Sequence, residues 1–242
     1  MKRILLTLIF LCGVHTIFGQ QDFTMPTDAD YPALPKTAAR PVDFIPAGWK
    51  TVSEAEGDLN GDRKKDFVLV IKANNEKFLN KNEGLGTEVF DTNPRILAIL
   101  FRENDQYKLV LQSNSFIAMA DSPTMEEPFQ DIKITNGVLQ FDFQIFMNAG
   151  GWGMSNQNYK FRFQNGEFVL IGADKNDVQR NSGETESRSY NFSTGKIQIR
   201  TGNISGKPKD KVQSRTIRLK ERKTLANFGK PFEWEVEKDY FL

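Results

Sequence analysis

The sequence contains only one cysteine and one histidine, Cys12 and His15, among its 242 residues. Both lie in an apolar run over 4–18 that follows two basic residues and ends at a small residue. This pattern predicts a secretory signal peptide over 1–19. The mature chain is then expected to begin near Gln20 and to be exported, either to the periplasm or to the extracellular space.

Without these two side chains, the mature chain has no thiol and no imidazole. Their absence excludes disulfides, zinc sites built on histidine or cysteine, and nucleophiles activated by histidine. An enzyme made from this chain would therefore have to rely on carboxylates. Outside the signal peptide, no apolar run approaches the ~20 residues that a membrane span needs, so no transmembrane anchor is predicted.

Charge is nearly balanced, with 32 Lys and Arg residues against 31 Asp and Glu residues, and it favours no class of partner. One stretch, 207–223, is basic, with eight cationic and two acidic residues. No aromatic side chains alternate with these cations, as a groove for single-stranded nucleic acid would require. The stretch is therefore predicted to be a solvated face, and nucleic-acid binding is not expected.

The fold is predicted from prolines and apolar patterns. Five prolines within 20–48 rule out long helices and predict an extended lead-in over 20–43. A single β-rich domain is expected over 44–242. Two short apolar runs, 67–71 and 96–101, predict strands that are buried on both faces.

Hairpins are predicted where turn residues separate alternating apolar and polar runs. Asn136-Gly137 and Asn165-Gly166 are the strongest signals, because both residue types tolerate the positive φ of a tight turn. Thr194-Gly195 is a weaker example. The expected fold class is mainly β: an antiparallel meander of hairpins, in propeller-blade-like or sandwich-like sheets, with few or no helices.

One loop has the pattern of a calcium site. Asp58, Asn60, Asp62 and Asp66 occupy the first, third, fifth and ninth positions of 58–66, directly before the first apolar strand. Calcium takes six to eight oxygen ligands, and short loops supply them from alternate residues and from main-chain carbonyls. The predicted metal ligands are these four side chains and the carbonyl of Lys64, with water in the remaining positions. The alternative is an ordinary hairpin turn with acids for solubility.

The loop is not an EF-hand, because its twelfth position is Leu69. It resembles the calcium loops of FG-GAP and integrin-type β-propeller repeats, in which Asp-x-Asp/Asn-x-Asp-Gly-x-x-Asp precedes a strand. One residue departs from this pattern, since Arg63 stands where the repeats have glycine. A non-glycine residue in a left-handed conformation costs on the order of 1 kcal/mol.

The resemblance extends beyond the loop. The segment 44–49, the Gly150-Gly151-Trp152-Gly153 turn and the strands over 159–163 and 170–172 resemble a group of uncharacterised exported bacterial proteins with a single FG-GAP/VCBS-like repeat. The likeness spans 44–196. It implies an envelope or secreted setting, and it implies no activity and no substrate.

Other candidate residues are few. Trp152 could stack on a sugar ring, but an aromatic residue in a glycine-rich turn is expected to fold back onto the sheet. Glu126 with Glu127, and Glu184 with Glu186, could supply the carboxylate pair of a glycoside hydrolase.

The sequence suggests three candidate functions. The first is an exported, non-enzymatic β module with a structural calcium ion that binds an envelope protein or a glycan. The alternatives are a carboxylate-based hydrolase acting on envelope or extracellular glycan, and a purely structural accessory domain. No oligomeric state is predicted.

Overall fold

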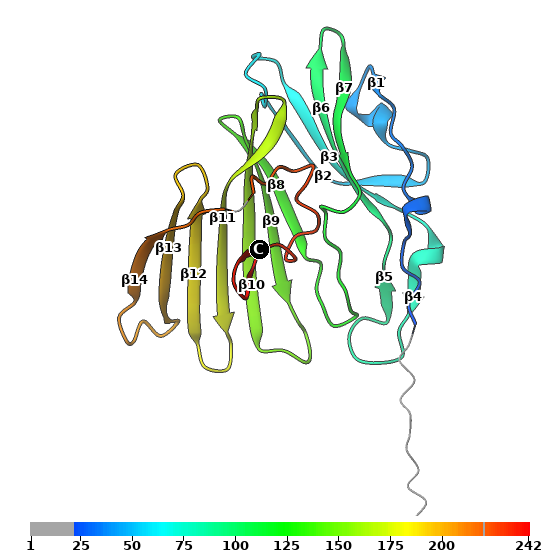
Figure 1. Ribbon diagram of the computed structural model, residues 1–242. Helices are drawn as coiled ribbons and strands as arrows, with labels where there is room; N and C mark the ends of the chain where they lie inside the picture. Colours follow the sequence, from blue (N-terminus) through cyan, green and yellow to red (C-terminus); the bar gives the residue numbers. More distant parts are fainter. Residues whose placement is uncertain (1–21, 220) are drawn as a thin grey trace, which may run out of the picture.

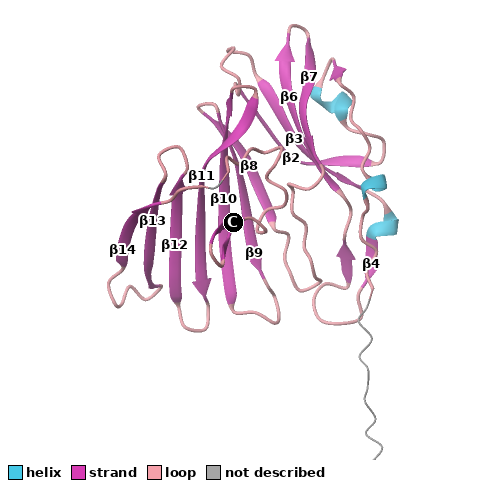
Figure 2. Ribbon diagram, viewed as in Figure 1, coloured by secondary structure: helices cyan, strands magenta, loops and turns pink. Residues whose placement is uncertain are grey.

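A computed structural model describes residues 22–219 and 221–242, which form a mainly β fold (Figure 1). The predicted signal peptide, with Cys12 and His15, lies outside the described residues, as does Lys220. Within the described part, the only helical segments are three short 3-10 turns, drawn in cyan in Figure 2. They are η1 (Asp28–Asp30), η2 (Pro41–Phe44) and η3 (Glu76–Phe78). The predicted fold class, antiparallel sheets of hairpins with few or no helices, is confirmed.

One sheet has five antiparallel strands in the order β1-β7-β6-β3-β2. They are β1 (Thr37–Ala38), β2 (Trp49–Gly57), β3 (Asp66–Ala73), β6 (Arg95–Glu103) and β7 (Gln106–Ser113). Two interior strands, β3 and β6, are buried along most of their length, because apolar clusters cover both faces of this sheet. The strands predicted from the apolar runs over 67–71 and 96–101 are thereby confirmed.

The second sheet is a meander of seven strands in the order β14-β13-β12-β11-β10-β9-β8. They are β8 (Phe129–Thr135), β9 (Val138–Phe146), β10 (Gly153–Gln164), β11 (Glu167–Gln179), β12 (Glu184–Asn191), β13 (Lys196–Asn203) and β14 (Lys211–Thr216). The predicted hairpin turns all lie between consecutive strands. At two of them, Asn136-Gly137 and Asn165-Gly166, both residues have positive φ.

The two sheets share a hydrophobic core, to which the C-terminal segment also contributes. Phe116, from the connection between β7 and β8, is fully buried at its centre. Its ring contacts five other aromatic rings at centroid distances of 4.8–6.1 Å. The C-terminal residues cross this side of the meander in Figure 1 and end in a small hairpin, β15 (Glu235–Glu237) and β16 (Tyr240–Phe241).

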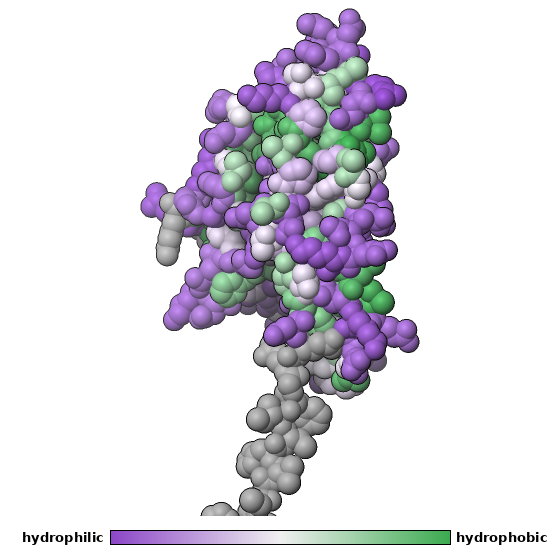
Figure 3. Space-filling view, turned by 90° about the vertical axis from the view of Figure 1, so that its right-hand side faces the viewer, coloured by the Kyte–Doolittle hydropathy of each residue, from purple (hydrophilic) through white to green (hydrophobic). Residues whose placement is uncertain are grey.

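The lead-in covers the other face of the five-stranded sheet. Leu34 and Phe44 are buried there, and Ile45 and Trp49 pack at the edge of the same cluster. Figure 3 shows this side of the molecule, on which small hydrophobic areas lie among hydrophilic residues. The polar segment over 73–94 contains η3 and a hairpin of β4 (Leu79–Lys81) and β5 (Val89–Asp91).

The sheets approach each other most closely where β2 meets β8. Gly57, the last residue of β2, lies against Ile134 of β8. A Cβ atom at Gly57 would be only 2.5 Å from Cγ2 of Ile134, so the close approach requires glycine. The calcium-like loop begins at the next residue and therefore lies at the junction of the two sheets.

Candidate functional site

The calcium-like loop connects β2 to β3, and Gly57 pairs with Asp66 across its base. The carboxylate of Asp58 holds the curl together. Its Oδ1 accepts a hydrogen bond from the Gly61 amide at 2.7 Å, and its Oδ2 accepts one from the Arg63 amide at 2.9 Å. The first acid of the pattern thus fixes the following five residues.

Two further side chains of the pattern also bond to the loop backbone. Asn60 Oδ1 accepts from the Asp62 amide at 2.9 Å, and Asp62 Oδ1 accepts from the Lys64 amide at 2.8 Å. Each is a turn closed by a side-chain oxygen two residues before the donor. Alternate side chains are therefore directed at the loop backbone.

Arg63 has φ of 66°, so it adopts the left-handed conformation that glycine would adopt at this position of the pattern. For a residue with a Cβ this conformation costs about 1–2 kcal/mol. The loop forms the curl despite the missing glycine, because the bonds to Asp58 and its neighbours compensate for this cost.

Asp66 differs from the other acids because its side chain is fully buried. Its two oxygens accept the Leu59 amide at 2.8 Å and the Arg102 amide at 3.0 Å, so it ties the loop to β6. Burial raises the pKa of the Asp66 carboxyl above its ordinary value, and these two hydrogen bonds lower it. The carboxylates of Asp62 and Asp58 raise the pKa further.

The negative charge of this loop has little cationic compensation. Lys64 Nζ lies 4.0 Å from Asp62, and within the described chain no lysine or arginine forms an ion pair with Asp66 or Asp58. The donor set, carboxylate, amide and carbonyl oxygen, is the chemistry that calcium prefers.

A survey of the described residues finds no group of three or more His, Cys, Asp or Glu side chains arranged to hold a metal ion. A cation at this loop would therefore need the amide oxygen of Asn60 and the carbonyl of Lys64 as well as carboxylates. The ligand set Asp58, Asn60, Asp62, Lys64 and Asp66 stays a prediction.

A second candidate site lies at the turn between β9 and β10. The expectation that Trp152 folds back onto the sheet was wrong, because this side chain is 64% exposed. Arg180, which follows β11, holds the turn instead. Its Nη2 donates to the carbonyls of Gly151 at 2.7 Å and Met147 at 3.0 Å, and its Nε donates to that of Trp152 at 3.3 Å. The indole is therefore not needed to close the turn and is presented to solvent.

Trp152 adjoins the outer face of the seven-stranded sheet, which we define as the face turned away from the shared core. At this end of the face, Phe146, Met154 and Val178 form a half-buried row across β9, β10 and β11. The guanidinium of Arg180 lies 4.5 Å from the centre of the Phe146 ring. An apolar row and an exposed indole, carried by a turn whose backbone Arg180 holds, thus occur near each other at the start of β10.

The next row of the outer face carries amides. Gln144, Asn156 and Asn176 are cross-strand neighbours, and Ser187 continues the row on β12. Gln144 Nε2 donates to Asn156 Oδ1 at 2.9 Å. These groups offer both donors and acceptors beside the apolar row. Sequence patterns did not reveal this arrangement, because it depends on the strand register.

The two candidate pairs of carboxylates for hydrolysis lie in different parts of the molecule. Glu127, which precedes β8, forms an ion pair with the buried Arg95, the first residue of β6. Glu184 and Glu186 lie on β12, four strands from β8 in the sheet. Glu186 is directly opposite Asp177 of β11, a partner that the sequence did not indicate.

Each acid of that opposed pair has its own cation. Glu186 bonds to Arg188 at 2.7 Å, and Asp177 lies 4.0 Å from Lys175. This arrangement is typical of an ion-pair network on a sheet surface.

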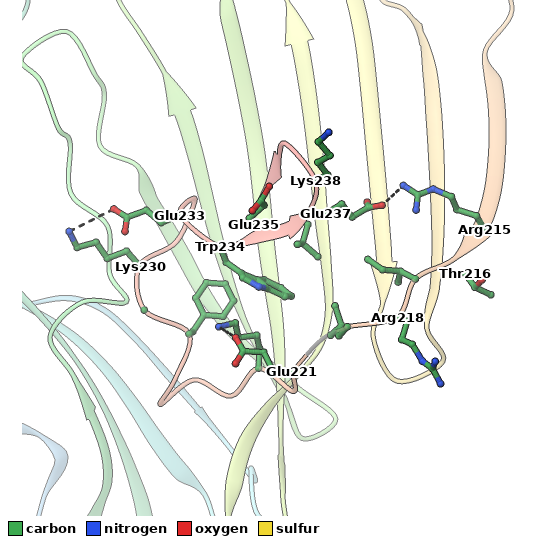
Figure 4. Close-up of a pocket in the computed structure, with 16 residues that line it drawn as sticks. Arg215, Thr216, Arg218, Glu221, Lys230, Glu233, Trp234, Glu235, Glu237 and Lys238 are labelled. Carbon is green, nitrogen blue, oxygen red and sulfur yellow. Dashed lines mark hydrogen bonds and ion pairs between the residues drawn. The ribbon is translucent and has the colours of Figure 1, made fainter.

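A groove of about 1240 Å³ lies between the C-terminal segment and the end of β14 (Figure 4). Phe228 and Trp234 contribute aromatic surface, and charged side chains line much of the rest. Several of these charges are paired within the groove, among them Arg215 with Glu237 and Lys230 with Glu233.

No protein-family model, no characterised protein and no solved structure matches this chain. The resemblance to FG-GAP/VCBS-like proteins therefore stays a prediction. Within the described residues, no helix has the length and apolar character needed to cross a membrane.

Proposed function

We propose that the protein is an exported, non-enzymatic β module that binds a glycan at the outer face of the seven-stranded sheet. A structural calcium ion at the β2–β3 loop is the second part of the proposal. The observation that carries the glycan site is the exposed indole of Trp152 on a turn fixed by Arg180.

The chemistry of the face suits a sugar. An indole offers a flat apolar surface that can cover the C–H face of a pyranose ring. The amides of Gln144, Asn156 and Asn176 can exchange hydrogen bonds with its hydroxyl groups. Because Arg180 fixes the turn in advance, little conformational entropy is lost when a ligand binds.

A non-enzymatic role is supported by the ion pairs of two of the four acids that could catalyse hydrolysis. Glu127 is held by Arg95 and Glu186 by Arg188. Carboxylates engaged in this way stabilise the fold and are poorly placed to transfer protons to a substrate. Binding is therefore the function that the arrangement of side chains favours.

The glycan proposal is tested by pull-down on insoluble peptidoglycan, chitin and xylan, followed by calorimetry with soluble fragments of any that bind. Trp152→Ala should weaken binding at least tenfold and leave the melting temperature unchanged. Leu85→Ala is the matched control, because Leu85 is 76% exposed in the polar segment before β5. Equal binding by the Trp152 variant, or binding to none of the glycans, would refute the proposal.

The calcium proposal is tested separately by calorimetric titration of chelator-treated protein. Calcium should raise the melting temperature, since a ligand at one hundred times its Kd adds about 2.7 kcal/mol to stability. Asp62→Ala should abolish this rise, whereas Asp105→Ala, which removes an exposed acid from the β6–β7 turn, should not. The absence of both heat and thermal stabilisation at millimolar calcium would exclude the site.

A further inference from the structure

The last strand of the meander, β14, has an open edge. It pairs only with β13, and all six of its residues are exposed. The other end of this sheet differs, since β8 is in contact with β2. An open edge carries a row of main-chain N–H and C=O groups that another strand can pair with. In Figure 1, β14 ends the sheet at the side away from the five-stranded sheet.

The open edge is positively charged. Lys207 and Lys209 precede the strand, Lys211 begins it, and Arg218 follows it. Within the described chain, none of these four cations forms an ion pair. Arg215 is held by Glu237 from the C-terminal hairpin, as Figure 4 shows, but its side chain is still 47% exposed. A guanidinium group has five N–H donors, so Arg215 can donate hydrogen bonds to a second carboxylate as well as to Glu237.

The charges lie on one side of the strand. Val212 and Ser214 pair with Arg200 and Gln198 on β13, and these residues belong to the outer face. Because side chains alternate along a strand, Lys211, Gln213 and Arg215 point to the opposite side. The edge therefore presents two cations four residues apart on one side and the half-exposed Val212 on the other.

We propose that β14 binds an extended acidic polypeptide segment as an eighth strand of the sheet. The segment would carry acidic residues at positions i and i+4, opposite Lys211 and Arg215, and small or β-branched residues between them. Six residues of strand span about 20 Å, which is an ordinary length for added-strand recognition. This site goes beyond the proposed glycan function and uses a different surface of the sheet.

The same charges argue against two other occupants. Antiparallel pairing of β14 with a second copy of itself would place Lys211 opposite or close to Arg215, and like charges in that position are destabilising. A nucleic acid would meet the cations but could not pair with the strand backbone, and no aromatic side chains are interleaved for base stacking. An acidic strand would place carboxylates opposite the cations of β14 and would also pair with its main-chain N–H and C=O groups.

The test uses a fluorescently labelled peptide, Ser-Glu-Val-Thr-Val-Glu-Ser, and fluorescence anisotropy at low ionic strength. The protein should bind it in a saturable manner. Lys211→Glu should weaken binding at least tenfold. Lys50→Glu, the same charge change on β2 of the other sheet, should alter it less than twofold. A peptide with lysine in place of both glutamates should not bind.

Backbone pairing is tested with two N-methylated peptides. In one, the amides of every second residue are methylated, and in the other the alternate set is methylated. Only one set can face β14, so one peptide should lose binding at least tenfold and the other should retain it. Equal binding by both would show attraction to any polyanion and would overturn the proposal. So would concentration-dependent dimerisation of the protein, seen by sedimentation and strengthened by Lys211→Glu, because that change would remove the like-charge repulsion expected between two β14 strands.

Discussion

The most informative substitution in the calcium-like loop is Asp66→Asn. Asp66 is fully buried, and its two oxygens each accept one main-chain amide, from Leu59 and from Arg102. Asparagine has nearly the same shape but only one oxygen. One of the two amides would therefore face an NH₂ group and lose its acceptor. A buried donor left without a partner costs about 1–3 kcal/mol.

A second effect opposes this loss. Burial raises the pKa of Asp66, which means that the native state disfavours the ionised carboxylate. Asparagine carries no charge and avoids this penalty. We expect the unpaired amide to dominate at pH 7 and the variant to lose about 1–2 kcal/mol of unfolding free energy.

The raised pKa of Asp66 also determines how the effect of Asp66→Asn on stability changes with pH. A group whose native pKa is raised contributes stability that is fully present below its unfolded pKa and is lost as the pH rises through its native pKa. Asp66 therefore favours the wild-type protein most under acidic conditions. The difference in stability between wild type and Asp66→Asn should be larger at low pH than at pH 7.

The assay is urea unfolding in the presence of a chelator, at pH 7 and at a lower pH where the wild type remains folded. Asp105→Asn is the control, because Asp105 is exposed and should change stability by less than 0.5 kcal/mol. Equal stability of Asp66→Asn and wild type at pH 7, or a difference that shrinks toward acidic pH, would refute the reasoning.

Three further substitutions test the core, the loop and the junction of the sheets. Phe116→Ala should cost about 3–5 kcal/mol in urea unfolding, because a fully buried ring is removed, and a loss below ~1.5 kcal/mol would contradict its central position. Arg63→Gly should raise the unfolding free energy by up to about 1 kcal/mol, since it relieves a left-handed arginine, and an unchanged melting temperature would count against strain there. Gly57→Ala should cost about 1–3 kcal/mol, because the new Cβ would overlap Ile134, and calorimetric melting curves should show the loss.

Features encoded by neighbouring residues could be predicted from the sequence. The Asn136-Gly137 and Asn165-Gly166 turns adopt positive φ because these residue types allow it locally. The burial of β3 and β6 follows from runs of apolar residues that have no polar face to turn toward water.

Features that depend on distant residues could not be predicted. The turn that carries Trp152 is held by Arg180, 28 residues later in the chain, whose guanidinium donates to main-chain carbonyls of the turn. The buried role of Asp66 depends on the Arg102 amide of β6, 36 residues later in the chain. The row of amides on the outer face requires the strand register, which no local pattern specifies.

The topology of the meander also has a kinetic consequence. From β8 to β14, every hydrogen-bonded neighbour in the sheet is the next strand in the chain. Contacts of short sequence separation form quickly, because little loop entropy is lost when they close. The five-stranded sheet instead pairs β3 with β6 and β1 with β7, across longer stretches of chain. We therefore expect the meander to form one hairpin after another before the five-stranded sheet is complete, although the strands of the five-stranded sheet are synthesised first.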